Sequence, residues 1–186
     1  CDLGIDKIIK YTLDQQSKKI KSSKAISTTP GSGPRHFVIN KNDKLAYSIN
    51  ELDSTITSFR IDKKNDISSF QNISTIPLDY TLETTTADLH FSLENKFLYG
   101  SNRGHDSIAQ FEIKTDGSLK FLNHFSTLGK TPRNFGISNS NKFALVANEN
   151  SDTIYSFYIN EINGSFEPTG NKIEIPSPVC LLEIFK

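Results

Sequence analysis

The sequence contains no methionine and no tryptophan, and it has only two cysteines, Cys1 and Cys180, in 186 residues. Two cysteines are too few for a disulfide framework, so a reducing cytoplasm is the expected compartment. The lack of methionine matters too, because a natural start would carry one. Since Cys1 falls inside a strand-like pattern, we expect a processed or incomplete chain.

The chain also lacks an excess of charge of either sign, because 21 Lys and Arg residues balance 21 Asp and Glu residues. Without surplus positive charge there is no general attraction for nucleic acid or an acidic membrane, so neither is expected as a partner. No apolar run approaches the roughly 20 residues of a membrane span, and no signal-peptide pattern opens the chain. Any recognition of an anion must therefore depend on individually placed arginines.

What the sequence does contain is an internal repeat. Three segments align without a gap: "DKLAYSINELDSTITSFRID" (43–62), "NKFLYGSNRGHDSIAQFEIK" (95–114) and "NKFALVANENSDTIYSFYIN" (141–160). The opening "CDLGIDKIIKYTLD" fits the same frame as a truncated copy, and "SPVCLLEI" near the C-terminus begins another. We predict a single domain with repeats at about 1–30, 31–83, 84–128 and 129–175, and a closing strand at 177–184.

Each repeat has the pattern of β-strands, since Phe, Ile, Tyr, Val and Ser alternate over short runs that end at Asn, Asp and Gly clusters. "KTDGSLKF" (114–121) and "EINGSFEP" (161–168) predict hairpin turns of the Asp-Gly and Asn-Gly kind. All-β repeats of roughly 40 to 50 residues with four strands each are typical of propeller blades. A β-sandwich is the alternative, but its strands need not recur at a fixed period. We therefore predict an all-β propeller of four-stranded blades.

This architecture brings two separate motifs to one rim. If the strands of a blade are named a to d from the channel outwards, the start of a and the end of b lie on the same face, because neighbouring strands run in opposite directions. Arg35 and His36 begin a strand a, and Glu51 follows the strand b that pairs with it. The equivalent turns of the other repeats hold Arg133, Asn134, Arg103, His105, Asp106, Glu149 and Asp152. The opposite turns are plain and polar, so one face is predicted to be functional.

Other kinds of site are weakly supported. The turn "PGSGPRH" (30–36) lacks the third glycine of a dinucleotide fingerprint and the Gly-Lys-Ser/Thr of a P-loop, and it leads into a strand. The four histidines have no metal-ligand spacing, so neither a metal nor another cofactor is expected. His90 lies two residues inside a strand a, where a satisfied core histidine is the more frequent explanation and a role in the site is the alternative.

Three segments, "GSGPRHFVINKNDKLAYSINELDSTIT", "ADLHFSLENKFLYGSNRGHDSIAQFEI" and "GKTPRNFGISNSNKFALVANENSDTI", closely resemble the propeller-type 6-phosphogluconolactonase family, which includes carboxy-cis,cis-muconate lactonizing enzymes. The resemblance covers essentially the whole chain. It implies a seven-bladed propeller with its active site at the channel mouth, of which this chain supplies about four blades as a C-terminal portion. It assigns Arg35 and Glu51 to the family's proposed site, with Arg103 as a second arginine, and places His36 and Arg133 in recurrent motifs.

The resemblance implies metal-independent hydrolysis of a sugar lactone, 6-phosphogluconolactone to 6-phosphogluconate in the pentose phosphate pathway. Such a reaction needs a general base for water and a group that stabilises the oxyanion. Glu51 would act as the base, alone or with a histidine, and Arg35 and Arg103 would bind the phosphate or the oxyanion. The predicted substrate-binding residues are His36, Arg133, His105 and His90. The family pattern also uses a histidine from a blade that would precede Cys1.

Three alternatives remain open from the sequence. Glu51 could pair with Arg35 only to fix the turn, although an exposed pair contributes at most about 1 kcal/mol. The propeller could be a binding platform, which would usually present exposed aromatic side chains at its mouth. A muconate-type lactonizing enzyme would use the same arginines on substrate carboxylates.

The two ends of the chain allow two arrangements. In the repeat alignment Cys1 takes the position of Ile49 and Cys180 that of His36, which face each other if the hairpin turn is centred on Asn42 and Asp43. A closed ring of four blades would place these cysteines about 4.5–5.5 Å apart between Cβ atoms. The family resemblance implies instead an open arc with its two ends well apart, and this is the expected structure.

Overall fold

The computed structural model describes residues 1–40, 42 and 44–184, and its regular structure is almost entirely β-strand. The strands form one two-stranded sheet and three four-stranded sheets, all with antiparallel neighbours. The helical elements among these residues are two single turns, η1 (Leu3–Ile5) and η2 (Glu149–Ser151). No helix in the described part of the chain has the length and hydropathy needed to span a membrane. The all-β prediction is confirmed.

We call the four sheets blades I to IV in chain order. Blade I consists of β1 (Lys7–Asp14) and β2 (Lys19–Ser27). The strands of blade II are β3 (Pro34–Asn40), β4 (Leu45–Asn50), β5 (Thr55–Ile61) and β6 (Ile67–Ser74). Blade III contains β7 (Thr85–Phe91), β8 (Phe97–Arg103), β9 (Ser107–Ile113) and β10 (Leu119–Ser126). Blade IV contains β11 (Pro132–Ile137), β12 (Phe143–Asn148), β13 (Thr153–Ile159) and β14 (Phe166–Glu174).

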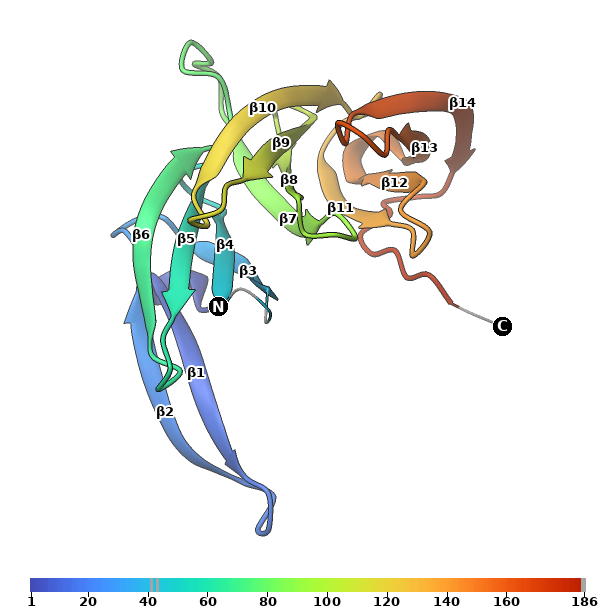
Figure 1. The fold of residues 1–186 in the computed structure, drawn as a ribbon. Helices are drawn as coiled ribbons and strands as arrows, with labels where there is room; N and C mark the ends of the chain where they lie inside the picture. The colour runs from blue at the N-terminus through green and yellow to red at the C-terminus, as the bar shows by residue number, and fades with distance from the viewer. Residues whose placement is uncertain (41, 43, 185–186) are drawn as a thin grey trace.

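The blades follow one another along an open arc (Figure 1). Within blades II to IV the strand order in the sheet matches the order in the chain, so β3, β7 and β11 are the predicted strands a, and β7 contacts both β3 and β11. Cys1 and Cys180 are free, exposed and outside every strand, so they are not paired across one hairpin. The closed ring of four blades is therefore wrong for this chain. Asp43, one of the two residues of the expected turn, lies outside the described residues.

The expected closing strand at 177–184 differs from the structure, in which these residues form no strand. No strand of the described chain runs beside them to supply a ladder of hydrogen bonds. Side chains of blade IV hold the segment instead: Leu181 donates its backbone N–H to Asn134 Oδ1 at 2.7 Å, and Asn139 donates to Glu183. The polar contacts explain how it stays ordered without a sheet partner.

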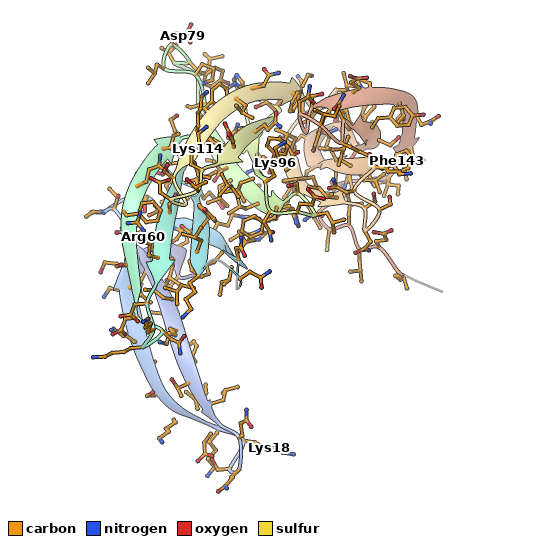
Figure 2. All side chains as sticks on the ribbon, viewed as in Figure 1. Lys18, Arg60, Asp79, Lys96, Lys114 and Phe143 are labelled. Carbon is orange, nitrogen blue, oxygen red and sulfur yellow. The ribbon has the colours of Figure 1, made fainter. Side chains whose placement is uncertain are left out.

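Packing between blades explains which strands are buried. Strand β4 is buried along its whole length and β8 along nearly all of it, because each lies inside a sheet that neighbouring blades cover on both faces. The core accordingly forms three clusters of apolar side chains, one between each pair of adjacent blades. The hairpin β1–β2 extends away from the other blades and carries Lys18 at its tip, whereas Phe143 lies in blade IV at the opposite end of the arc (Figure 2).

A repeated tyrosine contact ties blade II to blade III and blade III to blade IV. Tyr47 on β4 donates its hydroxyl to the carbonyl of Gly117 at 2.9 Å, and Tyr99 on β8 donates to Gly164 at 2.9 Å. Both glycines lie in the predicted hairpin turns, which are confirmed, and both have positive φ. A Cβ on Gly164 would lie 2.5 Å from the Tyr99 hydroxyl, so the turn needs glycine for conformation and for space. Each contact therefore fastens the second strand of one blade to the outer hairpin turn of the next blade.

Candidate active site

The Arg35 and Glu51 side chains are brought together by one hairpin, as the sequence predicted. Pro34 pairs with Asn50 in the β3–β4 register, and the Glu51 backbone N–H donates to the carbonyl of Gly33 at 2.7 Å. Arg35 Nε then lies 2.9 Å from Glu51 Oε2. The local sequence alone therefore positions one arginine against one carboxylate.

A second arginine comes from the neighbouring blade. Arg103, the last residue of β8, places Nη2 2.9 Å from Glu51 Oε1, so each carboxylate oxygen accepts from a different guanidinium group. Backbone carbonyls of β7 complete the arrangement: Arg103 donates to Thr86 at 2.8 Å and Arg35 donates to Ala87. We call Arg35, Glu51 and Arg103 the arginine cluster. It lies at the inner rim where blades II and III meet.

Blade IV repeats half of this arrangement. Arg133 occupies the position of Arg35 and Glu149 that of Glu51, and Arg133 Nη1 lies 3.2 Å from Glu149 Oε2. Burial and the nearby positive charges of Arg103 and Arg133 lower the pKa of Arg35, while the negative charge of Glu51 opposes that shift. Arg133 is thus close enough to the arginine cluster to act on it electrostatically.

An acidic residue that the sequence analysis missed lies beside this cluster. Asp88 on β7 has a side chain that is only 3% exposed, and it stands at the repeat position of His36 and Asn134. Its Oδ1 lies 2.6 Å from His36 Nδ1, and its Oδ2 lies 3.0 Å from His90 Nε2. Asn134 also donates its side-chain amide to Oδ2, and the Phe135 backbone N–H donates to it at 3.2 Å. One carboxylate therefore connects the inner strands of blades II, III and IV.

Burial alone would raise the pKa of the Asp88 carboxyl, but hydrogen bonds from His36 and His90 hold that pKa well below its usual range. The group is thus an anion at neutral pH. The signal in the sequence was an acid inside the apolar pattern "TADLHF", two residues before His90.

The predicted histidines divide between two places. His36 and His90 meet at Asp88, and the His90 side chain is 40% exposed, so the core explanation for His90 is wrong. His90 also borders an open cavity of about 700 Å³, which Phe135 and Leu181 line as well. His105 lies elsewhere: its Nδ1 is 2.6 Å from Ser107 Oγ, and its ring packs against Tyr80 and His124.

The three turn aspartates have local roles. Asp53 accepts a hydrogen bond from the Thr55 hydroxyl at 2.7 Å. Asp106 and Asp152 accept from the backbone N–H of Thr131 and Ser177, respectively, and each so holds the segment that follows the last strand of its own blade. Within the described residues no group of three or more His, Cys, Asp or Glu side chains is arranged to hold a metal ion.

Four-stranded blades follow one another along an arc, and charged residues gather at its inner rim. This arrangement identifies the protein as a β-propeller. The whole of residues 1–183 matches the family model described as "Lactonase, 7-bladed beta-propeller". The chain belongs to this lactonase family. Seven blades, which the family resemblance implied, are the architecture that the family description gives.

Individual relatives support the same assignment. A 6-phosphogluconolactonase of Formosa agariphila is 40% identical over 164 residues, which are 84% of this chain and 45% of that protein. A 6-phosphogluconolactonase of Bacillus subtilis is 32% identical over 182 residues, 97% of this chain and 52% of that protein. The solved structure of a periplasmic gluconolactonase from Pseudomonas aeruginosa matches with a TM-score of 0.89 at 30% identity, covering 95% of this chain and 50% of that one. The chain spans about half the length of the curated relatives it matches.

Proposed function

We propose that the protein hydrolyses a sugar lactone at the arginine cluster, with 6-phosphogluconolactone as the substrate and 6-phosphogluconate as the product. The observation that carries this proposal is the pair of arginines held on one carboxylate, Arg35 and Arg103 on Glu51. Guanidinium groups fixed in this way suit a phosphate or a developing oxyanion, because their donors are oriented before the substrate arrives. The relatives named 6-phosphogluconolactonase support the choice of substrate.

The roles within the cluster follow from its contacts. Both oxygens of Glu51 accept from guanidinium groups, so in this proposal Glu51 orients the arginines and a histidine serves as the base. Arg133 is held less tightly, because it contacts one carboxylate at 3.2 Å. We assign it to the charged group of the substrate that lies away from the reacting carbonyl. The chemistry is metal-independent, because a base and fixed positive charge supply what the reaction needs. The cytoplasm, expected from the two unpaired cysteines, stays a prediction, and one structural relative is periplasmic.

The experiment measures lactone hydrolysis by Arg35→Ala, corrected for spontaneous hydrolysis. We expect kcat/KM to fall on the order of 100-fold with the fold intact, since one positioned donor to the oxyanion or phosphate is lost. Arg60→Ala is the matched control: Arg60 pairs with Leu45 at the opposite end of the same sheet and should keep full activity. Equal activity of Arg35→Ala and the wild type at matched stability would remove Arg35 from the site. Turnover of a carboxymuconate in place of the lactone would favour the lactonizing enzyme.

A further inference from the structure

The contacts of His36 define its tautomer. Its Nδ1 faces Asp88 Oδ1 at 2.6 Å, and a carboxylate oxygen can only accept, so Nδ1 must carry the proton. Its Nε2 lies 3.3 Å from Arg35 Nη1, and a guanidinium group can only donate, so Nε2 must present its lone pair. Two independent neighbours therefore require the same form of the ring.

His90 contacts the same carboxylate in the opposite sense. Its Nε2 points at Asp88 Oδ2 at 3.0 Å, so that nitrogen is engaged with the carboxylate. In His36 the engaged nitrogen is Nδ1, and Nε2 lies next to Arg35, which belongs to the arginine cluster. The His36 side chain is 43% exposed, whereas that of Asp88 is 3% exposed. The His90 side chain is as exposed, at 40%, so exposure does not separate the two rings; the position of His36 Nε2 beside the arginine cluster does.

From this geometry we propose that His36 is the general base of the reaction and that Asp88 is its positioning residue. The proposal rests on the proposed function and adds to it the identity of the base. A buried carboxylate on Nδ1, with Nε2 directed toward the reacting atoms, is how an imidazole is held in its basic tautomer. The Asn134 amide and the Phe135 N–H, both on β11, fix Asp88 in turn.

The proton balance of the hydrolysis is complete with these groups. When the Arg35 guanidinium turns to the bound substrate, its hydrogen bond to His36 Nε2 is released and the attacking water takes its place. As this water attacks the lactone carbonyl carbon, His36 Nε2 takes one water proton. The carbonyl electron pair moves to the oxygen, which a guanidinium group of the cluster stabilises. When the carbonyl re-forms, the bond from carbon to the ring oxygen breaks. The departing ring oxygen takes the proton from Nε2, which returns His36 to its starting form. Asp88 stays ionised throughout.

A pH dependence follows, because only neutral His36 can accept a proton. The charged groups that contact His36 are Arg35 on its own strand and Asp88 on β7, and Asp88 in turn contacts His90. Activity of the wild type should therefore decline toward acid pH, because a protonated ring has no lone pair to offer. His36→Gln should lower kcat by about 10²- to 10⁴-fold with KM changed only a few-fold, and its remaining activity should lack this acid limb.

The test measures kcat, KM and the pH profile for 6-phosphogluconolactone with the full chain. Its variants are His36→Gln, Asp88→Asn, Arg35→Ala and the control His124→Gln. His124 lies in the outer strand β10, and its ring contacts the carbonyl of Thr75. Asp88→Asn should lower kcat far more than KM, because an amide no longer favours the proton on Nδ1. His124→Gln should keep the wild-type rate and profile. A His36→Gln variant that retains the rate while Arg35→Ala loses it would overturn the base assignment and leave the proposed function standing.

A second measurement does not depend on turnover. Nitrogen-15 spectra of labelled histidine should show His36 protonated on Nδ1 in the wild type at neutral pH, and a shifted tautomer population in Asp88→Asn. A His36 ring protonated on Nε2 would overturn the proposal even in an active protein. If Asp88→Asn does not fold, the wild-type spectrum and the His36→Gln kinetics decide. A folded wild type without lactone hydrolysis would overturn the proposed function and the base assignment together.

Discussion

Glu51→Gln tests whether one carboxylate holds two guanidinium groups. The three side chains are largely buried, with exposed fractions of 22% for Glu51, 19% for Arg35 and 15% for Arg103, and both nitrogen–oxygen distances are 2.9 Å. A hydrogen bond to a charged group contributes about 1.5–3 kcal/mol to stability, and glutamine can still accept one neutral hydrogen bond. The substitution also leaves two partly buried positive charges near each other. We therefore expect the free energy of unfolding to fall by about 2–4 kcal/mol.

The matched control is Glu149→Gln, the same substitution one blade further on. Glu149 contacts a single arginine at 3.2 Å, and that arginine is 39% exposed, so the loss should stay below about 1 kcal/mol. Urea denaturation at neutral pH and low salt measures the loss of unfolding free energy in both variants. Added salt should reduce the loss in Glu51→Gln by a smaller fraction than the loss in Glu149→Gln, because salt screens buried charges less than exposed ones. Equal losses in the two variants, or a loss below about 1 kcal/mol for Glu51→Gln, would refute the bridging role of Glu51.

Two further predictions concern contacts away from the arginine cluster. Tyr99→Phe should lower the free energy of unfolding by about 1–3 kcal/mol, because it leaves the Gly164 carbonyl without its donor, whereas exposed Tyr158→Phe should change it by less than about 0.5 kcal/mol in urea denaturation. Equal effects would argue against the contact between blades. Burial lowers the pKa of His105 and His124 below 6.5, and the charge of His124 lowers that of His105 further. The unfolded chain then binds more protons than the folded one as pH falls below 6.5, so stability should decrease from pH 7 to pH 5. A urea midpoint that falls as steeply in the double variant, His105→Gln with His124→Gln, as in the wild type would contradict this cause.

The sequence determined the repeat and the pairing within each blade. Strands alternate in direction, so the register of one hairpin is enough to place Arg35 next to Glu51 and, one repeat later, Arg133 next to Glu149. The turns at Gly117 and Gly164 follow from local conformational preference in the same way. These features depend on neighbours along the chain, which periodicity reports directly.

Only the tertiary structure decided what crosses from one blade to the next. Arg103 stands in the same repeat position as Glu51, yet its side chain turns toward the preceding blade and binds that carboxylate. His105, three residues after Asn102, packs instead against Tyr80. The role of Asp88 depends on β3 and β11 lying on either side of β7, because this arrangement brings His36 and Asn134 to one carboxylate. The physical reason is that the twist and offset between blades come from packing of their apolar faces, which leaves no periodic trace in the order of residues.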